Sequence, residues 1–203
     1  MPFKSSKPSH STLNQVRIIA GSLRGRKIKF PNEIDLRPTP DRVRETLFNW
    51  LEPRIRGARC LDLFAGSGAL CIEAISRGAA QVVAVEYNNT VIQSLIKHKE
   101  EWHLDGLEIV NMDTREFLKT SSIKHPQTKF DIIFLDPPYQ SSLLEECFAL
   151  LKTFNGIHAE TLLYFESNQP VAKEWFEQWQ VIRNKKAGQV YYYLAQRKNS
   201  MLD

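Results

Sequence analysis

The sequence has no long hydrophobic run. No window of its 203 residues approaches the roughly 18 consecutive apolar residues that a membrane-spanning helix needs. The opening residues, MPFKSSKPSHST, are polar and lack the apolar centre of a secretory signal peptide. We therefore expect a cytoplasmic protein that does not associate with a membrane.

Cysteine is scarce, and histidine is scattered. The three cysteines, Cys60, Cys71 and Cys147, are odd in number and include no C-x-x-C pair. We expect them to be small buried side chains. The five histidines show no spacing typical of metal ligands, so no metal site is expected.

Negative charge is scarce in the first part of the chain. Residues 1–59 hold 13 Lys and Arg against 5 Asp and Glu, whereas residues 60–203 hold 14 against 18. The net charge of +4 therefore combines a strongly basic N-terminal part with a mildly acidic remainder. Such a segment suggests an arm that binds a polyanion, although a solvated basic surface would have the same composition.

Internal repeats and low-complexity tracts are also absent, and the length suits one domain with a small extension. The hydrophobic content of 42% is sufficient for a core of that size. We divide the chain into a disordered lead (1–15), a basic hairpin and helix (16–56) and a main domain (57–198).

The basic extension begins with a short β element. VRIIAGSLRGRKIKF, residues 16–30, has strand character on both sides of a central Gly-Ser pair, which predicts a β-hairpin. RPTPDRVRETLFNWLEP then predicts a helix. Thr39 is its expected N-cap, Pro40 its first residue and Pro53 its end.

From residue 59 onward, short apolar strands alternate with helical segments. Seven strands are predicted, over 59–64, 80–86, 107–111, 130–136, 161–167, 180–184 and 189–196. Helices are predicted over 66–78, 88–102, 113–120, 142–151 and 170–179. This alternation predicts an α/β fold with a doubly wound, mostly parallel, seven-stranded Rossmann-like sheet, whose last two strands form a hairpin joined by residues 185–188.

A glycine-rich turn follows the first predicted strand of this sheet. Asp62 closes the strand, and FAGSGALC places Gly66 and Gly68 before a helix. Glu86 ends the next strand about 20 residues later, where a carboxylate typically binds ribose hydroxyls. This arrangement predicts a nucleotide-like ligand at the carboxyl ends of the strands, with NAD and S-adenosylmethionine as candidates.

Three features bear on the choice between these ligands. NAD carries a pyrophosphate that binds a helix N-terminus, whereas S-adenosylmethionine is cationic and has no phosphate. Asp62, directly before the turn, suits a cationic ligand. Asp113 follows the third strand and is a candidate for binding the adenine amino group, although it could equally cap the next helix. Cys71 stands where a dinucleotide fingerprint has Gly or Ala.

The tetrapeptide DPPY, residues 136–139, ends the fourth strand and faces the same crevice. Its prolines remove two backbone N–H groups and fix two φ angles, so it cannot extend the sheet. It is either a simple strand-to-helix turn or a clamp for a planar amino group. In such a clamp, Asp136 and the Pro137 carbonyl would each accept one N–H, and Tyr139 would stack on an extruded base.

Together, these segments resemble one known family. RIIAG, RGRKI, RPTPDRVRETLFNWL, LDLFAGSGAL, EAISRGA, DPPY and AGQV are similar to segments of the RsmD family, and they span about residues 16–195. RPTPDRVRETLFN is the most specific of them, whereas DPPY is shared by many methyltransferases that act on amino groups. The family's turn usually reads G-A-L-G, and this chain has Cys71 in place of the last glycine.

The resemblance implies a methyltransferase fold and a specific activity. Members of the family transfer a methyl group from S-adenosylmethionine to N2 of one guanine in 16S ribosomal RNA. The resemblance implies that the cofactor is surrounded by Asp62, Phe64, Ala65, Gly66, Ser67, Gly68, Glu86 and Asp113. It implies that the guanine is held by Asp136, Pro137 and Tyr139. Six arginines of the basic extension would then contact RNA phosphates: Arg17, Arg24, Arg26, Arg37, Arg42 and Arg44.

Three alternatives remain open. A DNA adenine-N6 methyltransferase also uses DPPY, although this chain has no large insertion that would recognise DNA. A non-catalytic RNA-binding assembly factor would not need the intact DPPY and glycine turn, and an NAD oxidoreductase has no role for DPPY. For the methyltransferase we expect a monomer without metal. Its substrate would be an assembled or partly assembled small ribosomal subunit, because a short arm is ill-equipped to recognise an RNA hairpin unaided.

Overall fold

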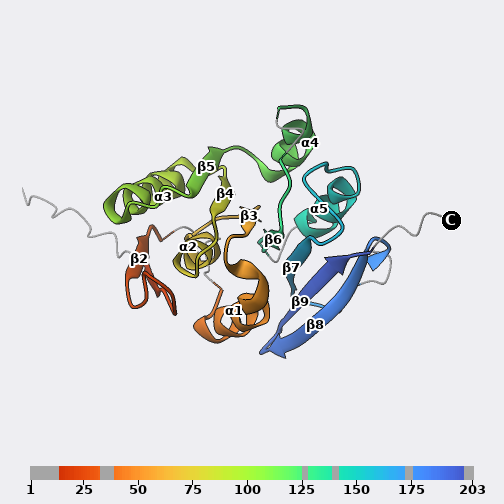
Figure 1. Ribbon diagram of the computed structural model, residues 1–203, viewed down its shortest axis with the longest axis horizontal. Coiled ribbons are helices and arrows are strands. Elements are labelled where there is room, and N and C mark those ends of the chain that lie inside the picture. The colour runs from red at the N-terminus through yellow and green to blue at the C-terminus, as the bar shows by residue number, and fades with distance from the viewer. Residues whose placement is uncertain (1–13, 33–38, 125–127, 139–141, 172–175, 199–203) are drawn as a thin grey trace, which may run out of the picture.

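The computed structural model describes residues 14–32, 39–124, 128–138, 142–171 and 176–198 (Figure 1). The strands are β1 (Asn14–Arg17), β2 (Lys27–Phe30), β3 (Arg59–Asp62), β4 (Gln81–Glu86), β5 (Leu107–Asn111), β6 (Ile132–Leu135), β7 (Leu162–Ser167), β8 (Trp179–Ala187) and β9 (Val190–Arg197). The helices are α1 (Asp41–Ile55), α2 (Ala69–Ser76), α3 (Asn89–Trp102), α4 (Thr114–Lys124) and α5 (Leu143–Leu151). Within these ranges, no helix has both the length and the apolar character to cross a membrane.

A seven-stranded sheet forms the centre of the molecule, in the order β5-β4-β3-β6-β7-β9-β8. β3 pairs in parallel with both β4 and β6, whereas β9 is antiparallel to β7 and to β8. The predicted doubly wound, mostly parallel sheet is therefore confirmed. Because β3 and β6 are neighbours, the glycine turn and the DPPY segment begin side by side, at the point where the strand order switches.

Alternate side chains of the central strands pack into two different cores. Cys60 and Phe134 face a core that also contains residues of α1, α2 and α3. Leu61 and Ile133 face a second core with residues of α4 and α5. Both faces of the sheet are thus covered, which explains why the strand sequences are apolar throughout instead of alternating with polar residues.

The basic extension packs onto the first core. β1 and β2 form an antiparallel hairpin, and Val16 and Ile28 are buried with residues of α1 to α3. Figure 1 shows the hairpin beside α2 and α3, away from the β8–β9 hairpin. Asn14 and Gln15 belong to β1, so the extension begins earlier than the predicted boundary, and the rest of the predicted lead lies outside the described residues.

Helix α1 differs from the prediction at both ends. Pro40, and not Thr39, occupies the N-cap position, and no side chain caps the helix. Pro53 lies inside the last turn and does not end the helix, which continues to Ile55. A proline there removes one helical hydrogen bond, and the complete burial of Leu51 and near-complete burial of Ile55 hold the turn in place.

The C-terminal hairpin is longer than predicted. The predicted helix over 170–179 is wrong at its end, because Trp179 is the first residue of β8 and is buried in the second core. Residues 172–175 of that segment lie outside the described residues. Most of the predicted link over 185–188 is strand, since β8 continues to Ala187 and pairs with β9 along its length.

Candidate active site

Four carboxylates gather at the carboxyl-end edge of the sheet. Glu86 ends β4, Asp62 ends β3, Asp136 follows β6, and Glu166 lies near the end of β7. These four parallel strands are neighbours. Asp62, Glu86 and Glu166 are buried, and Asp136 keeps some exposed surface. So much negative charge in one place favours a cationic ligand.

The glycine turn after β3 is held by backbone hydrogen bonds. The Ala65 N–H donates to the Val85 carbonyl over 3.0 Å, and the Gly68 N–H donates to the Ala65 carbonyl over 2.8 Å. Gly68 has a φ of +83°, and a Cβ atom there would lie 2.6 Å from the Leu95 side chain. The positive φ strains any residue with a side chain, and a Cβ would also force the Leu95 side chain to shift, which explains the glycine that directly precedes α2.

Glu86 joins the glycine turn to the end of β4. One carboxylate oxygen accepts the Gly66 N–H over 2.9 Å, and the other accepts the N–H groups of Tyr87 and Asn88 over 3.0 and 2.8 Å. Tyr87 itself is 66% exposed, unusually so for a large hydrophobic side chain. Its ring is therefore free to stack on a flat ligand beside Glu86.

Asp62 is a buried carboxylate with an unsatisfied oxygen. Its Oδ1 accepts the Phe64 N–H over 3.3 Å, whereas Oδ2 is buried and has no partner among the described residues. Burial raises the pKa of Asp62 to about 7, and the nearby Glu86 adds to this rise. A cationic group bound at this edge would lower that pKa again, so Asp62 fits an ammonium or sulfonium ligand and not a phosphate.

Asp113 caps the start of α4, which is one of the two roles that the sequence left open. It precedes α4, and its Oδ1 accepts the Arg115 N–H over 2.8 Å at the start of that helix. Its two oxygens also pair with the Arg115 guanidinium over 3.0 and 2.9 Å. These hydrogen bonds hold the pKa of Asp113 below its usual range. Binding of an adenine amino group would have to share this carboxylate with Arg115.

Cys71 lies in the first turn of α2, at the position where the family pattern has glycine. Its thiol donates to the Gly68 carbonyl over 3.5 Å. Like Cys60 and Cys147, it is a buried free cysteine, which confirms the expectation from the sequence. The substitution therefore leaves the glycine turn intact.

Asp136 is held by a residue from the basic extension. The Thr39 hydroxyl donates to Asp136 Oδ2 over 2.9 Å. Burial raises the pKa of Asp136 well above its usual value, the charges of Glu166 and Asp62 raise it further, and the Thr39 hydrogen bond acts in the opposite direction. Glu166 in turn accepts a 2.6 Å hydrogen bond from the Tyr164 hydroxyl.

Of the DPPY segment, the structure describes Asp136, Pro137 and Pro138. Pro137 is buried and Pro138 is exposed, directly beyond the end of β6. Tyr139 lies outside the described residues, as does Arg37 of the basic extension.

Four of the predicted RNA-binding arginines are on the surface. Arg17, Arg24, Arg26 and Arg42 are all exposed. The Arg26 guanidinium lies 5.4 Å from the centre of the Trp102 ring, which packs part of it against α3. These positions leave the four arginines accessible to a polyanion.

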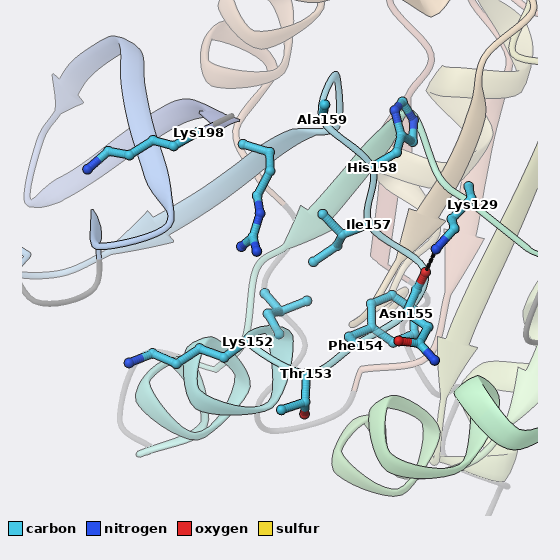
Figure 2. A pocket seen from close by; sticks show the side chains of 11 residues that line it. Lys129, Lys152, Thr153, Phe154, Asn155, Ile157, His158, Ala159 and Lys198 are labelled. Atoms are coloured by element: carbon cyan, nitrogen blue, oxygen red, sulfur yellow. Dashed lines mark hydrogen bonds between the residues drawn. The ribbon is translucent and has the colours of Figure 1, made fainter. Parts of the chain in front are cut away.

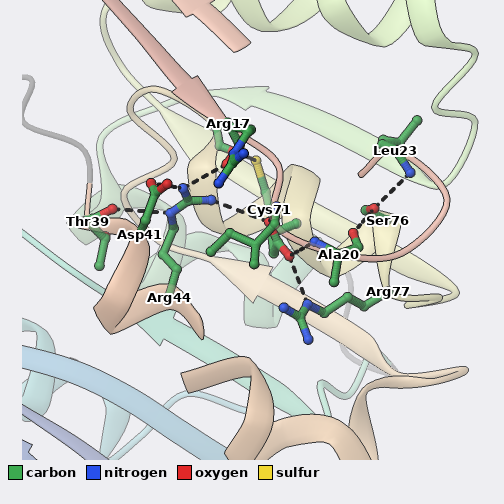
Figure 3. Close-up of polar contacts among 12 residues, drawn as sticks. Arg17, Ala20, Leu23, Thr39, Asp41, Arg44, Cys71, Ser76 and Arg77 are labelled. Carbon is green, nitrogen blue, oxygen red and sulfur yellow. Dashed lines mark hydrogen bonds and ion pairs between the residues drawn. The ribbon is translucent and has the colours of Figure 1, made fainter. Parts of the chain in front are cut away.

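Arg44 does not fit the prediction that it contacts phosphate. It is completely buried, and its guanidinium pairs with the buried carboxylate of Glu73 in α2 over 3.4 Å and with Asp41 over 2.6 Å. It also donates to the carbonyls of Thr39 and Arg17 over 3.2 and 2.8 Å (Figure 3). All its nitrogens are used inside the protein, so Arg44 fastens the extension to the main domain.

Glu73 completes this junction from the other side. Its carboxylate accepts the Ile19 and Ala20 N–H groups over 2.8 and 3.0 Å and pairs with Arg77 over 2.8 Å. Ser76, one turn later in α2, accepts the Leu23 N–H over 3.0 Å (Figure 3). The hairpin is thus bonded to the helix that follows the glycine turn.

Two cavities lie in different parts of the molecule. The larger, of about 510 Å³, lies at the opposite edge of the sheet, where β6 and β7 begin. Figure 2 shows Lys129, Lys152 and Lys198 around it. The smaller, of about 300 Å³, lies between the hairpin and the start of α1, and its lining includes Arg17 and Thr39. Only the smaller cavity is connected to the carboxylate edge, through Thr39.

Sequence reasoning missed three residues of this site. Thr39 was expected to cap a helix, and its contact with Asp136 spans 97 residues of sequence. Glu166 offered a signal, because it is a carboxylate near the end of an apolar strand, much as Asp62 and Glu86 are at the ends of theirs. Tyr87 follows such a carboxylate directly, and its exposure became visible only in the fold.

Comparison with known proteins agrees with this arrangement. The family model described as conserved hypothetical protein 95 matches residues 16–196. The chain is 45% identical over 193 residues to Ribosomal RNA small subunit methyltransferase D of Escherichia coli (strain K12), and the alignment covers 95% of each protein.

Solved structures share the fold. A candidate methyltransferase from Escherichia coli, yhhF, has a TM-score of 0.80 at 45% identity, covering 91% of this chain and 99% of that one. A second candidate methyltransferase, complexed with SAH, has a TM-score of 0.64 at 16% identity, covering 96% of this chain and 58% of that one. At that identity, the second likeness concerns the fold alone.

Proposed function

Because the chain belongs to the RsmD family, we propose that it transfers a methyl group from S-adenosylmethionine to the exocyclic N2 of a guanine in 16S ribosomal RNA. The observation that carries the proposal is the adjacency of β3 and β6. It places the glycine turn and its carboxylates beside Asp136 and Pro137, as transfer between a cofactor and an amino group requires.

The residues at the carboxyl-end edge suit S-adenosylmethionine as the cofactor. Its positive charge is matched by Asp62, whose buried Oδ2 has no partner among the described residues. Glu86 ends β4 where a carboxylate binds ribose hydroxyls, and exposed Tyr87 can stack on the adenine. The cofactor supplies an electrophilic methyl group on its sulfonium. Of the remaining positions that the family implies, Phe64, Ala65, Gly66, Ser67 and Gly68 form the turn, and Asp113 lies after β5.

The amino group of guanine is a poor nucleophile, because its lone pair is delocalised into the ring. Asp136 and the Pro137 carbonyl would each accept one N–H and turn the lone pair toward the methyl group. Tyr139 would stack on the base. After transfer, the nitrogen carries one proton too many. Asp136 would accept that proton, and its raised pKa makes it a better base than an exposed carboxylate.

The basic extension would bind the RNA. Arg17, Arg24, Arg26 and Arg42 are exposed, and Arg17 lines the 300 Å³ cavity together with Thr39. Phosphate contacts of this kind supply affinity without reading sequence. Selection of one guanine would then come from the shape of the substrate. Recognition by shape favours the assembled or partly assembled small subunit as the substrate. We propose that the enzyme acts as a monomer.

The substrate class is tested by offering the protein three acceptors with labelled S-adenosylmethionine: small ribosomal subunits that lack the modification, protein-free 16S ribosomal RNA and duplex DNA. We expect the fastest incorporation into the subunits. Equal rates on protein-free and assembled RNA would contradict the preference for an assembled substrate. Label in DNA alone would favour the adenine-N6 alternative, and no label in any acceptor would favour a non-catalytic assembly factor.

A further inference from the structure

Thr39 is poorly explained as a helix-capping residue. It lies beside the N-terminus of α1, where a threonine hydroxyl usually accepts a backbone N–H of the first turn. Here no side chain caps the helix, and the hydroxyl points instead to Asp136, to which it donates over 2.9 Å. Thr39 is 5% exposed, so water competes little for this hydrogen bond.

The backbone of Thr39 is fixed from two sides. Pro40 restricts the residue before it to extended conformations. The Arg44 side chain donates to the Thr39 carbonyl over 3.2 Å, and the same guanidinium is anchored on the buried Glu73 (Figure 3). A hydroxyl held in this way does not need to be ordered when substrate binds, which is the property of a preorganised contact.

From this geometry we infer that Thr39 is a positioning residue, which holds Asp136 with one oxygen occupied and the other directed toward the amino group of the target base. The inference rests on the proposed function and adds a residue to it. It also joins two parts of the molecule, because Thr39 lines the cavity beneath the basic hairpin while it contacts the carboxylate of the reacting site.

The electrostatic surroundings of Asp136 show why such a donor is needed. Glu166 approaches from β7 with Tyr164 bonded to it, and Asp62 approaches from β3. Among the described residues, no cation forms an ion pair with Asp136. A carboxylate that is mostly removed from water and lies beside two others tends to take up a proton, and its protonated oxygen would then no longer accept an N–H. The Thr39 hydroxyl opposes this by favouring the ionised form.

The inference is tested with Thr39→Val, which keeps the shape of the side chain and removes the hydroxyl. We expect single-turnover methyl transfer to unmodified small subunits to fall about 10- to 100-fold at neutral pH, as loss of one hydrogen bond to a charged group implies. The acid-side midpoint of the pH–rate profile should move to higher pH. Thr39→Ser restores the hydroxyl and should restore the midpoint.

Thr46→Val is the matched control. Thr46 lies in α1, the helix that follows Thr39, and its hydroxyl donates to the Arg42 carbonyl over 3.0 Å, away from Asp136. It should leave both the rate and the midpoint unchanged. A Thr39→Val enzyme whose rate falls equally at every pH, with the midpoint of the wild type, would overturn the inference, because the residue would then act through packing alone.

A second readout does not depend on activity. The carboxyl ¹³C resonance of Asp136, assigned by its loss in Asp136→Asn, should titrate at higher pH in Thr39→Val than in the wild type. An unchanged titration would overturn the inference even if the wild type is active. A third result is a titration that differs between Thr39→Val and the wild type while the wild-type protein methylates no RNA. That result would overturn the proposed function but would establish the contact between Thr39 and Asp136.

Discussion

At the scale of single residues, the site combines carboxylates in environments that differ sharply. Asp113 is partly exposed and paired with Arg115, which holds its pKa low, whereas burial raises the pKa of Asp62 to about 7. The buried carboxylates cost folding stability when they are ionised without a ligand. A cationic cofactor would offset that cost. The same buried carboxylates therefore lower the folding stability of the cofactor-free protein and favour binding of the cofactor.

Asp62→Asn should make the cofactor-free protein more stable at pH 8 but not at pH 4. The native pKa of about 7 lies above the unfolded value of 3.8, so the native state binds more protons between these values. The stability of the wild type therefore falls as pH rises from about 4 to about 7, and the variant lacks this loss. Thermal unfolding of both proteins at the two pH values measures the difference. A difference that does not depend on pH would contradict the raised pKa.

Asp136→Asn should reduce methyl transfer by about 100- to 1,000-fold, the range for removing one key group that stabilises a transition state. The amide keeps the shape of the side chain but accepts hydrogen bonds weakly and cannot take up the proton. Binding of S-adenosylhomocysteine, measured by calorimetry, should be retained because Asp136 is on the substrate side of the crevice. Full activity in this variant would exclude the clamp mechanism.

At the scale of elements, Arg42 and Arg44 have different roles: Arg42 is available to bind RNA, whereas Arg44 holds the extension to the main domain. Both lie in the first turns of α1, but Arg42 is exposed and Arg44 is completely buried against Glu73. The Arg44–Glu73 pair and the backbone bonds around it join the hairpin, α1 and α2. The extension is therefore built into the main domain and cannot be regarded as a separate arm.

Arg44→Gln should destabilise the protein by about 3 kcal/mol, because it removes a cation from the buried carboxylate of Glu73. Arg42→Gln, two residues away, should change the free energy of unfolding by less than about 0.5 kcal/mol. It should weaken RNA binding instead. Urea unfolding and an RNA-binding titration of both variants check the pair. Equal stability of the two variants would contradict the structural role of Arg44.

The elements could be predicted largely from the sequence, because parallel strands covered on both faces are short continuous apolar runs. The glycine turn, Glu86 and Asp136 could also be located, since each comes at the end of such a run. The partners of Thr39 and Arg44 could not. Both depend on tertiary packing that brings α1 onto β6 and α2, and a buried arginine has the same local sequence pattern as an exposed one. Trp179 was misassigned for a similar reason, since its place in β8 depends on pairing with β9.

At the scale of the whole molecule, positive charge is found at two opposite ends. Exposed Arg17 and Arg42 lie close to Thr39, which contacts Asp136 at the carboxylate edge. Lys152 and Lys198 line the larger cavity at the opposite edge (Figure 2). Only the first group is near the site where a base would react. We therefore expect RNA to bind at the end of the molecule that carries Arg17 and Arg42, and not wherever positive charge is exposed.

Removing Arg17 and Arg42 together, as glutamines, should make the salt dependence of RNA binding less steep. Each phosphate contact contributes about 0.7 to 0.9 to the slope of log K against log salt concentration. Lys152→Gln with Lys198→Gln removes the same charge at the opposite edge and should leave the slope unchanged. Binding titrations over a range of salt concentrations compare the two variants. If the lysine substitutions changed the slope more than the arginine substitutions, the RNA would bind at the edge opposite the carboxylates, which would contradict the proposed RNA-binding surface.

The central claim is methyl transfer to the N2 of a guanine in small-subunit ribosomal RNA. Its most direct test uses labelled S-adenosylmethionine and small ribosomal subunits that lack the modification, followed by nucleoside analysis of the RNA. The account predicts that the label is recovered as N2-methylguanosine from a single site. Label in another nucleoside, or binding of S-adenosylmethionine without any label in the RNA, would contradict it.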